Sequence, residues 1–278
     1  MPMIVLLAGA HGRVGSRVLA LLLGRGHRVR ALVRSERQAD ALRGLGAEAV
    51  VADLRGDVEW TADGCDAAIF AAGARHRGDL GAVDAGGGAK LAEAAYRYEH
   101  ARFVLCSALG AHEYEHRTGG VREFLAAKHH AELRVARLDM PWTILRFGRL
   151  TEAPGTGRID VVPRPGVGAT LGRDDAALAV VEALERPALA RRTIAIVDGE
   201  RSVGDALGAI PPRTLPPPQP APTARAVPLG AAQSANPPDA PDMLAADATP
   251  LDADVEWEGD GPVPPEPVGN EDPAPGIP

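Results

Sequence analysis

Three glycines that directly follow a short apolar run constrain the fold of this chain more than any other feature. The run Ile4–Ala8 is followed by Gly9, Gly12 and Gly15, and a second apolar stretch continues to Leu23. This order predicts a buried strand, a glycine turn and a helix, with bare backbone N–H groups at the positive end of the helix. Such a turn suits a pyrophosphate, and the residues predicted to hold it are Gly9, His11, Gly12, Arg13, Val14 and Gly15.

Arg34 stands at the position that decides which dinucleotide such a turn binds. Glycines at 24 and 26 end the first helix, and residues 28–33 form a second predicted strand, which completes a βαβ unit. After this strand, an acid binds the adenosine ribose of NAD, whereas an arginine accommodates the 2′-phosphate of NADP. Arg34, with Arg13 as a second cation, therefore favours NADP(H) over NAD(H). The other interpretation, in which Arg34 only ends a strand in solvent, stays open.

Apolar runs and helical stretches alternate up to about residue 210. The predicted strands are Glu48–Ala52, Ala67–Phe70, Arg102–Cys106, Trp142–Arg146 and Thr193–Val197, and the predicted helices are Glu36–Leu45, Asp57–Asp63, Val83–Tyr98, Val121–Leu138 and Asp174–Arg186. This pattern indicates the α/β class, here a Rossmann-type doubly wound parallel sheet in a single domain of residues 1–210. Ligands of such sheets bind beyond the carboxyl ends of the strands. The residues expected there, beside the adenine and the rest of the cofactor, are Asp53, Leu54, Ala71, Ala72 and Gly73.

The composition changes sharply after residue 210. Residues 211–278 hold 19 of the 25 prolines, and their eleven acidic residues against two arginines give them a net charge of −9. Such a segment has too little apolar material to offset its ordering entropy, so we expect a disordered, Pro-rich acidic C-terminal tail. It is interpreted as a solvated spacer, or as a peptide around residues 252–258 that docks a protein partner.

Several classes of function are disfavoured by what the sequence lacks. Residues 1–210 are close to neutral and carry no basic stripe, which argues against a nucleic-acid partner. The sequence shows neither a long apolar span nor a signal peptide, so we expect no membrane contact and a cytoplasmic protein. Cys65 and Cys106 lack metal-ligand spacing, so we expect reduced thiols and no metal site.

From Met3 to Ile210 the chain resembles the atypical short-chain dehydrogenase/reductase proteins, specifically the NAD(P)H-binding, NmrA-like group that includes flavin and biliverdin reductases. The matching segments are Gly-Ala-His-Gly-Arg-Val-Gly at 9–15, Ala-Leu-Val-Arg at 31–34, Ala-Asp-Leu at 52–54, Cys-Asp-Ala-Ala-Ile-Phe-Ala-Ala-Gly at 65–73, Trp-Thr-Ile-Leu-Arg at 142–146 and Pro-Gly-Thr-Gly-Arg-Ile at 154–159. The resemblance implies an NAD(P)H-dependent oxidoreductase acting on a small carbonyl, quinone or flavin-like acceptor.

The resemblance also implies a catalytic Ser after the fifth strand and a Tyr-x-x-x-Lys pair on the next helix. Ser107 and Lys128 match these positions and are expected both in catalysis and beside the cofactor. Phe124 stands where the family has tyrosine, so the ring is kept but the phenolic proton is missing. This leaves two hypotheses, an enzyme that obtains its proton elsewhere and a non-catalytic NADP(H)-binding redox sensor.

Other details of the site stay open at the level of sequence. Tyr114, His112 and His116 precede the helix of Lys128 and are candidate proton donors. Arg146 ends a strand, and its expected partner is an acid such as Asp174 or Asp175. The substrate is a small molecule that the sequence does not identify. A homodimer is considered through the two predicted helices Val83–Tyr98 and Val121–Leu138.

Overall fold

The computed structural model describes residues 1–74, 79–98, 102–163 and 168–213. Its centre is a nine-stranded sheet of order β11-β8-β10-β6-β5-β4-β1-β2-β3. The strands are β1 (Ile4–Ala8), β2 (Arg28–Val33), β3 (Glu48–Val51), β4 (Ala67–Phe70), β5 (Arg102–Ala108), β6 (Trp142–Phe147), β8 (Arg158–Val161), β10 (Arg192–Asp198) and β11 (Arg201–Ser202). The six neighbouring strands from β6 to β3 all pair in parallel, so the predicted α/β, doubly wound architecture is confirmed. Of the predicted acidic tail at 211–278, residues 214–278 lie outside the described residues.

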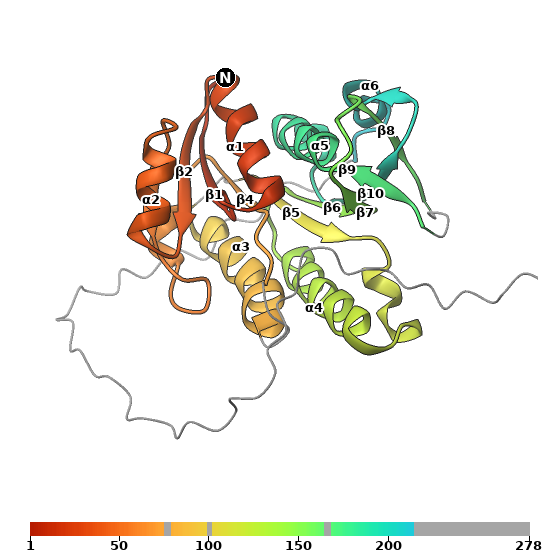
Figure 1. Ribbon diagram of the computed structural model, residues 1–278, viewed down its shortest axis with the longest axis horizontal. Coiled ribbons are helices and arrows are strands. Elements are labelled where there is room, and N and C mark those ends of the chain that lie inside the picture. Colours follow the sequence, from red (N-terminus) through yellow and green to blue (C-terminus); the bar gives the residue numbers. More distant parts are fainter. Residues whose placement is uncertain (75–78, 99–101, 164–167, 214–278) are drawn as a thin grey trace, which may run out of the picture.

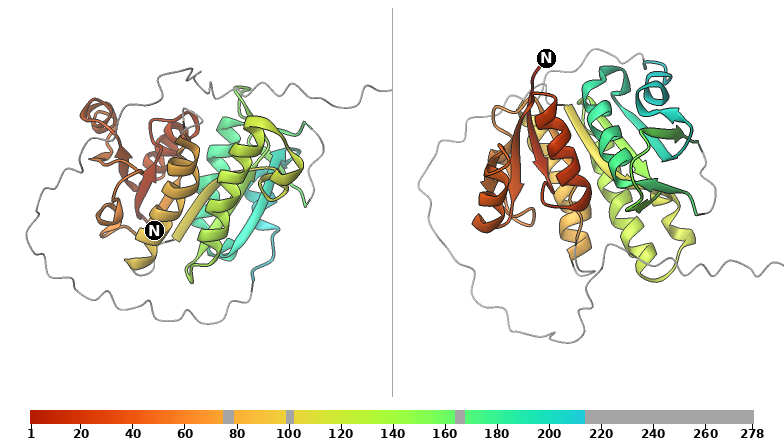
Figure 2. Two further views of the ribbon diagram at one scale, coloured as in Figure 1. Left: turned by 90° about the horizontal axis from the view of Figure 1, so that it is seen from below. Right: turned by 45° about the horizontal axis from the view of Figure 1, so that its top comes forward.

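The helices cover both faces of this sheet, with α1 and α5 on one face and α3 and α4 on the other (Figure 1), an arrangement that Figure 2 shows from two further directions. They are α1 (Arg13–Gly24), α2 (Glu36–Arg43), α3 (Gly88–Arg97), α4 (Gly119–Ala136), α5 (Arg173–Glu185) and α6 (Val203–Gly208). Strand order reverses between β1 and β4, which lie side by side although α1, β2, α2 and β3 separate them in the chain. Ligands of open α/β sheets bind at this switch point.

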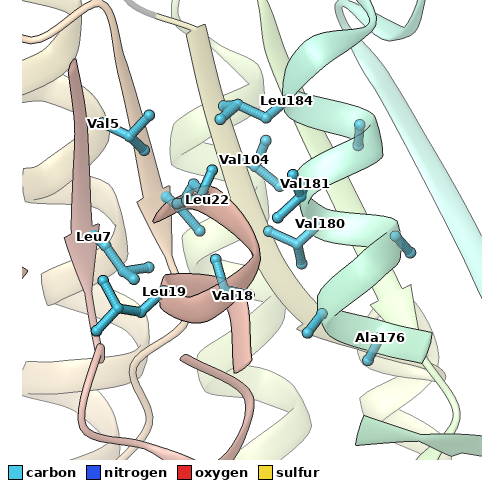
Figure 3. Packing of buried hydrophobic residues seen from close by; sticks show 14 of the residues in the cluster. Val5, Leu7, Val18, Leu19, Leu22, Val104, Ala176, Val180, Val181 and Leu184 are labelled. Atoms are coloured by element: carbon cyan, nitrogen blue, oxygen red, sulfur yellow. The ribbon is translucent and has the colours of Figure 1, made fainter. Parts of the chain in front are cut away.

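Apolar side chains at helical spacing hold α1 and α5 on the sheet (Figure 3). Val18, Leu19 and Leu22 of α1 are at most 1% exposed, and they meet Val180 and Leu184 of α5 within one core cluster. Val18 with Leu22, and Val180 with Leu184, have i, i+4 spacing, which puts the two side chains of each pair on one face of their helix. Burial of one such leucine contributes roughly 2 kcal/mol, so this cluster fixes the helix whose first turn borders the site.

The segment between β6 and α5 holds strands where the sequence pattern predicted neither a strand nor a helix. Two short strands, β7 (Arg149–Thr151) and β9 (Thr170–Gly172), form a small parallel sheet. β8 pairs antiparallel to β10, so the sheet is mostly rather than wholly parallel. β8 is only four residues long, and Ile159 is its fully buried apolar residue, so the sequence holds little strand signal there.

The predicted helix Val83–Tyr98 has a different beginning in the structure. A π-helical segment covers Leu80–Gly87, and the α-helical part begins at Gly88. Glycine has low helix propensity, and the run of three glycines at 86–88 allows this wider turn. The predicted helix at 57–63 is likewise only a 3₁₀ turn, Glu59–Ala62.

Candidate functional site

The glycine turn joins β1 to α1 by close backbone packing. Gly9 has φ +89°, and its carbonyl oxygen accepts a hydrogen bond of 2.8 Å from the N–H of Gly12. A Cβ on Gly15 would stand 2.0 Å from the Gly9 oxygen, and one on Gly9 would stand 2.6 Å from the backbone of Ala71. Glycines 9 and 15 therefore bring strand, turn and helix together, as the sequence predicted.

The N-terminus of α1 has the chemistry of an anion site. Gly12 is its N-cap and supplies no side-chain cap, and the first turn of the helix contains no acidic residue. The exposed N–H groups and the helix dipole favour a phosphate. The bare turn and uncapped helix end therefore fit the pyrophosphate of a dinucleotide.

Glu152, which the sequence analysis did not single out, lies among arginines beside this helix. Its carboxylate is 3.5 Å from Arg13, 3.1 Å from Arg17 and 2.9 Å from Arg173. The carboxylate of Glu152 is half exposed, so these ion pairs are open to exchange with an anionic ligand. Arg13 thus has a protein partner near the turn.

Arg34 and Asp53 lie at the ends of neighbouring strands, as predicted. Arg34 follows β2 and is exposed, and its backbone N–H donates to Gln38 Oε1 at 3.0 Å. Hydrogen bonds from Arg55 hold the pKa of the Asp53 carboxyl below its usual range, and the charge of Arg34 acts in the same direction. Asp53 therefore stays ionised at neutral pH and is engaged with Arg55. Lys90 binds the carbonyl oxygen of Arg55 at 2.9 Å, which steadies the loop that follows.

Ser107 belongs to a buried polar chain at the end of β5. Its hydroxyl donates to Oε1 of Glu132 at 2.6 Å. Arg146, from the neighbouring strand β6, donates from Nε and Nη2 to the same carboxylate at 2.9 Å and 2.6 Å. Its Nη1 lies 2.9 Å from Nδ1 of His112. Glu132 is 3% exposed, so α4 supplies the anion that links the two strand ends.

The hydrogen bond from Ser107 to Glu132 limits what the Ser107 hydroxyl offers to a ligand. A hydroxyl has one proton and two lone pairs, whereas an ionised carboxylate only accepts. With Glu132 ion-paired to Arg146, the proton of Ser107 is directed at Glu132. Ser107 therefore presents lone pairs, and its preferred ligand partner is a hydrogen-bond donor.

Lys128 lies one turn before Glu132 on α4 and is also buried. Its Nζ is 2.8 Å from Oδ1 of Asp84, and it stands 5.6 Å from the centroid of the Phe124 ring. The structure thus places a buried carboxylate beside each of Ser107 and Lys128, the two residues that the sequence assigned to the site. Both acids lie far from their partners in sequence, so spacing could not reveal them.

The expected partner of Arg146 was wrong. Asp174 pairs with Arg17 at 2.6 Å, and Asp175 accepts backbone N–H groups at 156 and 157. Both acids belong to the first turn of α5, on the opposite face of the sheet from α4. Arg146 turns instead toward Glu132. Of the proposed proton donors, His112 reaches this cluster, whereas the ring of Tyr114 packs against those of His129 and His130.

The remaining expectations concern cysteines, metals and membranes. Desolvation raises the pKa of the Cys106 thiol to about 12 and also raises that of Cys65. Both thiols therefore stay protonated at neutral pH, whereas a nucleophile requires the thiolate. Among the described residues, no three His, Cys, Asp or Glu side chains gather as metal ligands. No helix in that part of the chain has the length and apolar character to cross a bilayer.

Known proteins resemble this chain over more than two thirds of its length. A protein of Bacillus subtilis (strain 168) named uncharacterized sugar epimerase YhfK is 36% identical over 212 residues, covering 73% of this chain and 98% of its own length. The UPF0659 protein YMR090W of Saccharomyces cerevisiae is 30% identical over 214 residues, covering 71% and 94%.

Solved structures show the same fold. The oxidoreductase ylbE of Lactococcus lactis superposes with a TM-score of 0.65 and 27% identity, covering 75% of this chain and 96% of its own. ChuY, an anaerobillin reductase of Escherichia coli O157:H7, gives a TM-score of 0.61 at 22% identity, covering 71% and 98%, and shows likeness of fold alone. The model of the NAD(P)H-binding family matches residues 9–187, from the first glycine of the turn to two residues past the end of α5. The chain therefore belongs to the NAD(P)H-binding family, in agreement with its resemblance to atypical short-chain dehydrogenase/reductases.

Proposed function

We propose that this protein is an NADPH-dependent oxidoreductase that acts on a small molecule. One observation carries the proposal. The glycine turn, Arg34, Ser107 with Glu132, and Lys128 with Asp84 all lie toward the carboxyl ends of the parallel strands. The turn and helix α1 would hold the pyrophosphate, and Arg34 the adenosine end. When bound, the nicotinamide supplies or accepts a hydride. Ser107 and Lys128 orient the reacting groups beyond the ends of β4 and β5.

Preference for NADPH is expected to depend on Arg34. The Arg34→Asp variant should bind NADPH at least ten-fold more weakly than the wild type does, because an acid repels the 2′-phosphate that a guanidinium would bind. Its affinity for NADH, which lacks this phosphate, should be about that of the wild type. Fluorescence titration of the purified protein with each cofactor measures both constants.

Arg28→Asp is the matched control for this titration. Arg28 is also exposed, and it begins β2, whereas Arg34 follows the other end of this strand. This variant carries the same change of charge and should bind both cofactors as the wild type does. Equally weakened NADPH binding in both variants would show only a general electrostatic effect. Unchanged NADPH binding in Arg34→Asp would refute the assignment of Arg34 to the 2′-phosphate.

Turnover is tested in the same cuvette. Oxidation of bound NADPH by a panel of quinones, flavins and small carbonyl compounds would establish a reductase. Tight NADPH binding with no oxidation by any acceptor favours the non-catalytic redox sensor, which the phenylalanine at 124 supports because the phenolic acid is missing.

A second candidate reaction is the oxidation of a substrate hydroxyl as a step of epimerisation, in which the hydride would pass to NADP⁺ and the hydroxyl proton to solvent. The orientation of Ser107 favours it: the lone pairs of Ser107 accept a hydrogen bond from a hydroxyl, whereas a carbonyl oxygen needs a donor. The relative in Bacillus subtilis that is named a sugar epimerase adds support. Reduction of NADP⁺ by polyols and hexoses, absent in Ser107→Ala, would support this direction over carbonyl reduction.

A further inference from the structure

Asp84 is a fully buried acid that sequence reasoning did not connect with the site. It lies in the π-helical segment Leu80–Gly87 and is 0% exposed. One oxygen, Oδ1, is 2.8 Å from Nζ of Lys128 on α4. The other, Oδ2, accepts a hydrogen bond of 2.7 Å from the backbone N–H of Ala74. A single carboxylate therefore connects helix α4 with the loop that follows β4.

That loop borders the glycine turn. The backbone of Ala71 packs against Gly9 so closely that an added Cβ would stand 2.6 Å away. Arg34 and Asp53, at the ends of β2 and β3, lie on the other side of β1. An extended dinucleotide whose adenosine end lies over β2 must cross β1 and reach the ends of β4 and β5, which is where Lys128 stands.

Lys128 keeps hydrogen-bonding capacity in this arrangement. An ammonium group has three donors, and the contact of Nζ with Oδ1 of Asp84 at 2.8 Å is an ion pair. The Phe124 ring covers another side of the ammonium at 5.6 Å. The ion pair fixes the position of the ammonium group. It also offsets the charge of a lysine that is only 8% exposed, since a buried ammonium needs a partner.

We propose that Asp84 is a positioning residue for the nicotinamide half of the cofactor. Its carboxylate holds Lys128 and the Ala74 loop together, so that the ammonium of Lys128 is presented to hydroxyl groups of the ribose next to the nicotinamide. The inference rests on the proposed function, because it requires that the glycine turn and the neighbouring strand ends bind NAD(P)H. It assigns Asp84 no contact with the cofactor itself.

The test compares two probes that share the adenosine end, NADPH and 2′,5′-ADP, which lacks the nicotinamide half. In Asp84→Asn, the amide oxygen still accepts from Ala74, but the charge that holds Lys128 is lost. We expect the Kd for NADPH to rise about ten-fold and the Kd for 2′,5′-ADP to stay within two-fold of the wild type. In Asp84→Ala, hydrogen exchange at the Ala74 amide should also become faster.

Glu93→Gln serves as the matched control. Glu93 and Arg134 form another ion pair between α3 and α4, at 2.6 Å, with both side chains 43% exposed. This variant should bind both probes as the wild type does. If Asp84→Asn does not fold, the doubly neutral Asp84→Asn/Lys128→Gln protein replaces it, with the same selective loss expected.

Three outcomes would overturn the inference. Unchanged NADPH binding in Asp84→Asn would show that the pair does not position the cofactor. Equal loss of NADPH and 2′,5′-ADP in a folded variant would show a general structural role. Wild-type protein that binds 2′,5′-ADP but gains nothing from the nicotinamide half would remove this inference alone, whereas failure to bind either probe would also remove the proposed function.

Discussion

Replacing Gly15 by alanine is expected to abolish NAD(P)H binding and to lower the free energy of unfolding by about 3 kcal/mol. The new Cβ would stand 2.0 Å from the carbonyl oxygen of Gly9 and 2.6 Å from its carbonyl carbon. Both are backbone atoms, so no side chain can rotate away. Either α1 moves off the sheet or the turn opens, and each change displaces the N–H groups that would face a phosphate.

Gly24→Ala gives the matched control on the same helix. An added Cβ at Gly24, the last residue of α1, meets no atom within 4 Å. Because alanine has the higher helix propensity, this variant should be unchanged or up to about 1 kcal/mol more stable. Urea unfolding and NADPH titration of both variants measure the two effects. Full cofactor binding by Gly15→Ala would contradict the tight junction described for β1 and α1.

The second large effect is expected at Glu132. Glu132→Gln should lower the free energy of unfolding by about 3 kcal/mol, because removal of one partner leaves a largely buried Arg146 without its counter-ion. The side chain of Arg146 is only 17% exposed and that of Glu132 is 4% exposed. The amide oxygen still accepts from Ser107, so the loss reports on the ion pair.

Two further proteins make this measurement specific. Glu93→Gln breaks the exposed pair with Arg134 and should cost less than about 1 kcal/mol. The double variant Glu132→Gln/Arg146→Met removes both charges and should recover much of the lost stability. A loss below about 1 kcal/mol in Glu132→Gln, or a double variant less stable than the single one, would contradict the described pairing.

Local patterns were sufficient to predict the central part of the fold. The apolar run at 4–8, the three glycines and the strand at 28–33 predict a βαβ unit, and the structure confirms β1, α1 and β2 there. These elements are specified by residues close together in the sequence, through helical spacing and glycine geometry. Arg34 and Asp53 follow because each lies within two residues of the end of a strand.

The buried acids Asp84 and Glu132 were not predicted because their partners are distant in sequence. Asp84 and Lys128 are 44 positions apart, and Glu132 meets Ser107 across 25 positions. Whether such groups meet depends on how a π-helical segment turns and on which face of β6 carries Arg146. An isolated sequence offers several acids for one arginine, which is why Asp174 and Asp175 were chosen wrongly.

The position of β1 between β2 and β4 has a consequence for the order in which the dinucleotide site is completed. Ala71, whose backbone packs against Gly9, follows it by 62 residues. The N-terminal part of a chain leaves the ribosome first during synthesis. A nascent chain that ends before β4 therefore contains the whole glycine motif but lacks the Ala71 backbone that packs against Gly9. The ability to bind a dinucleotide arises when the fourth strand is inserted beside the first, well after the motif itself has left the ribosome.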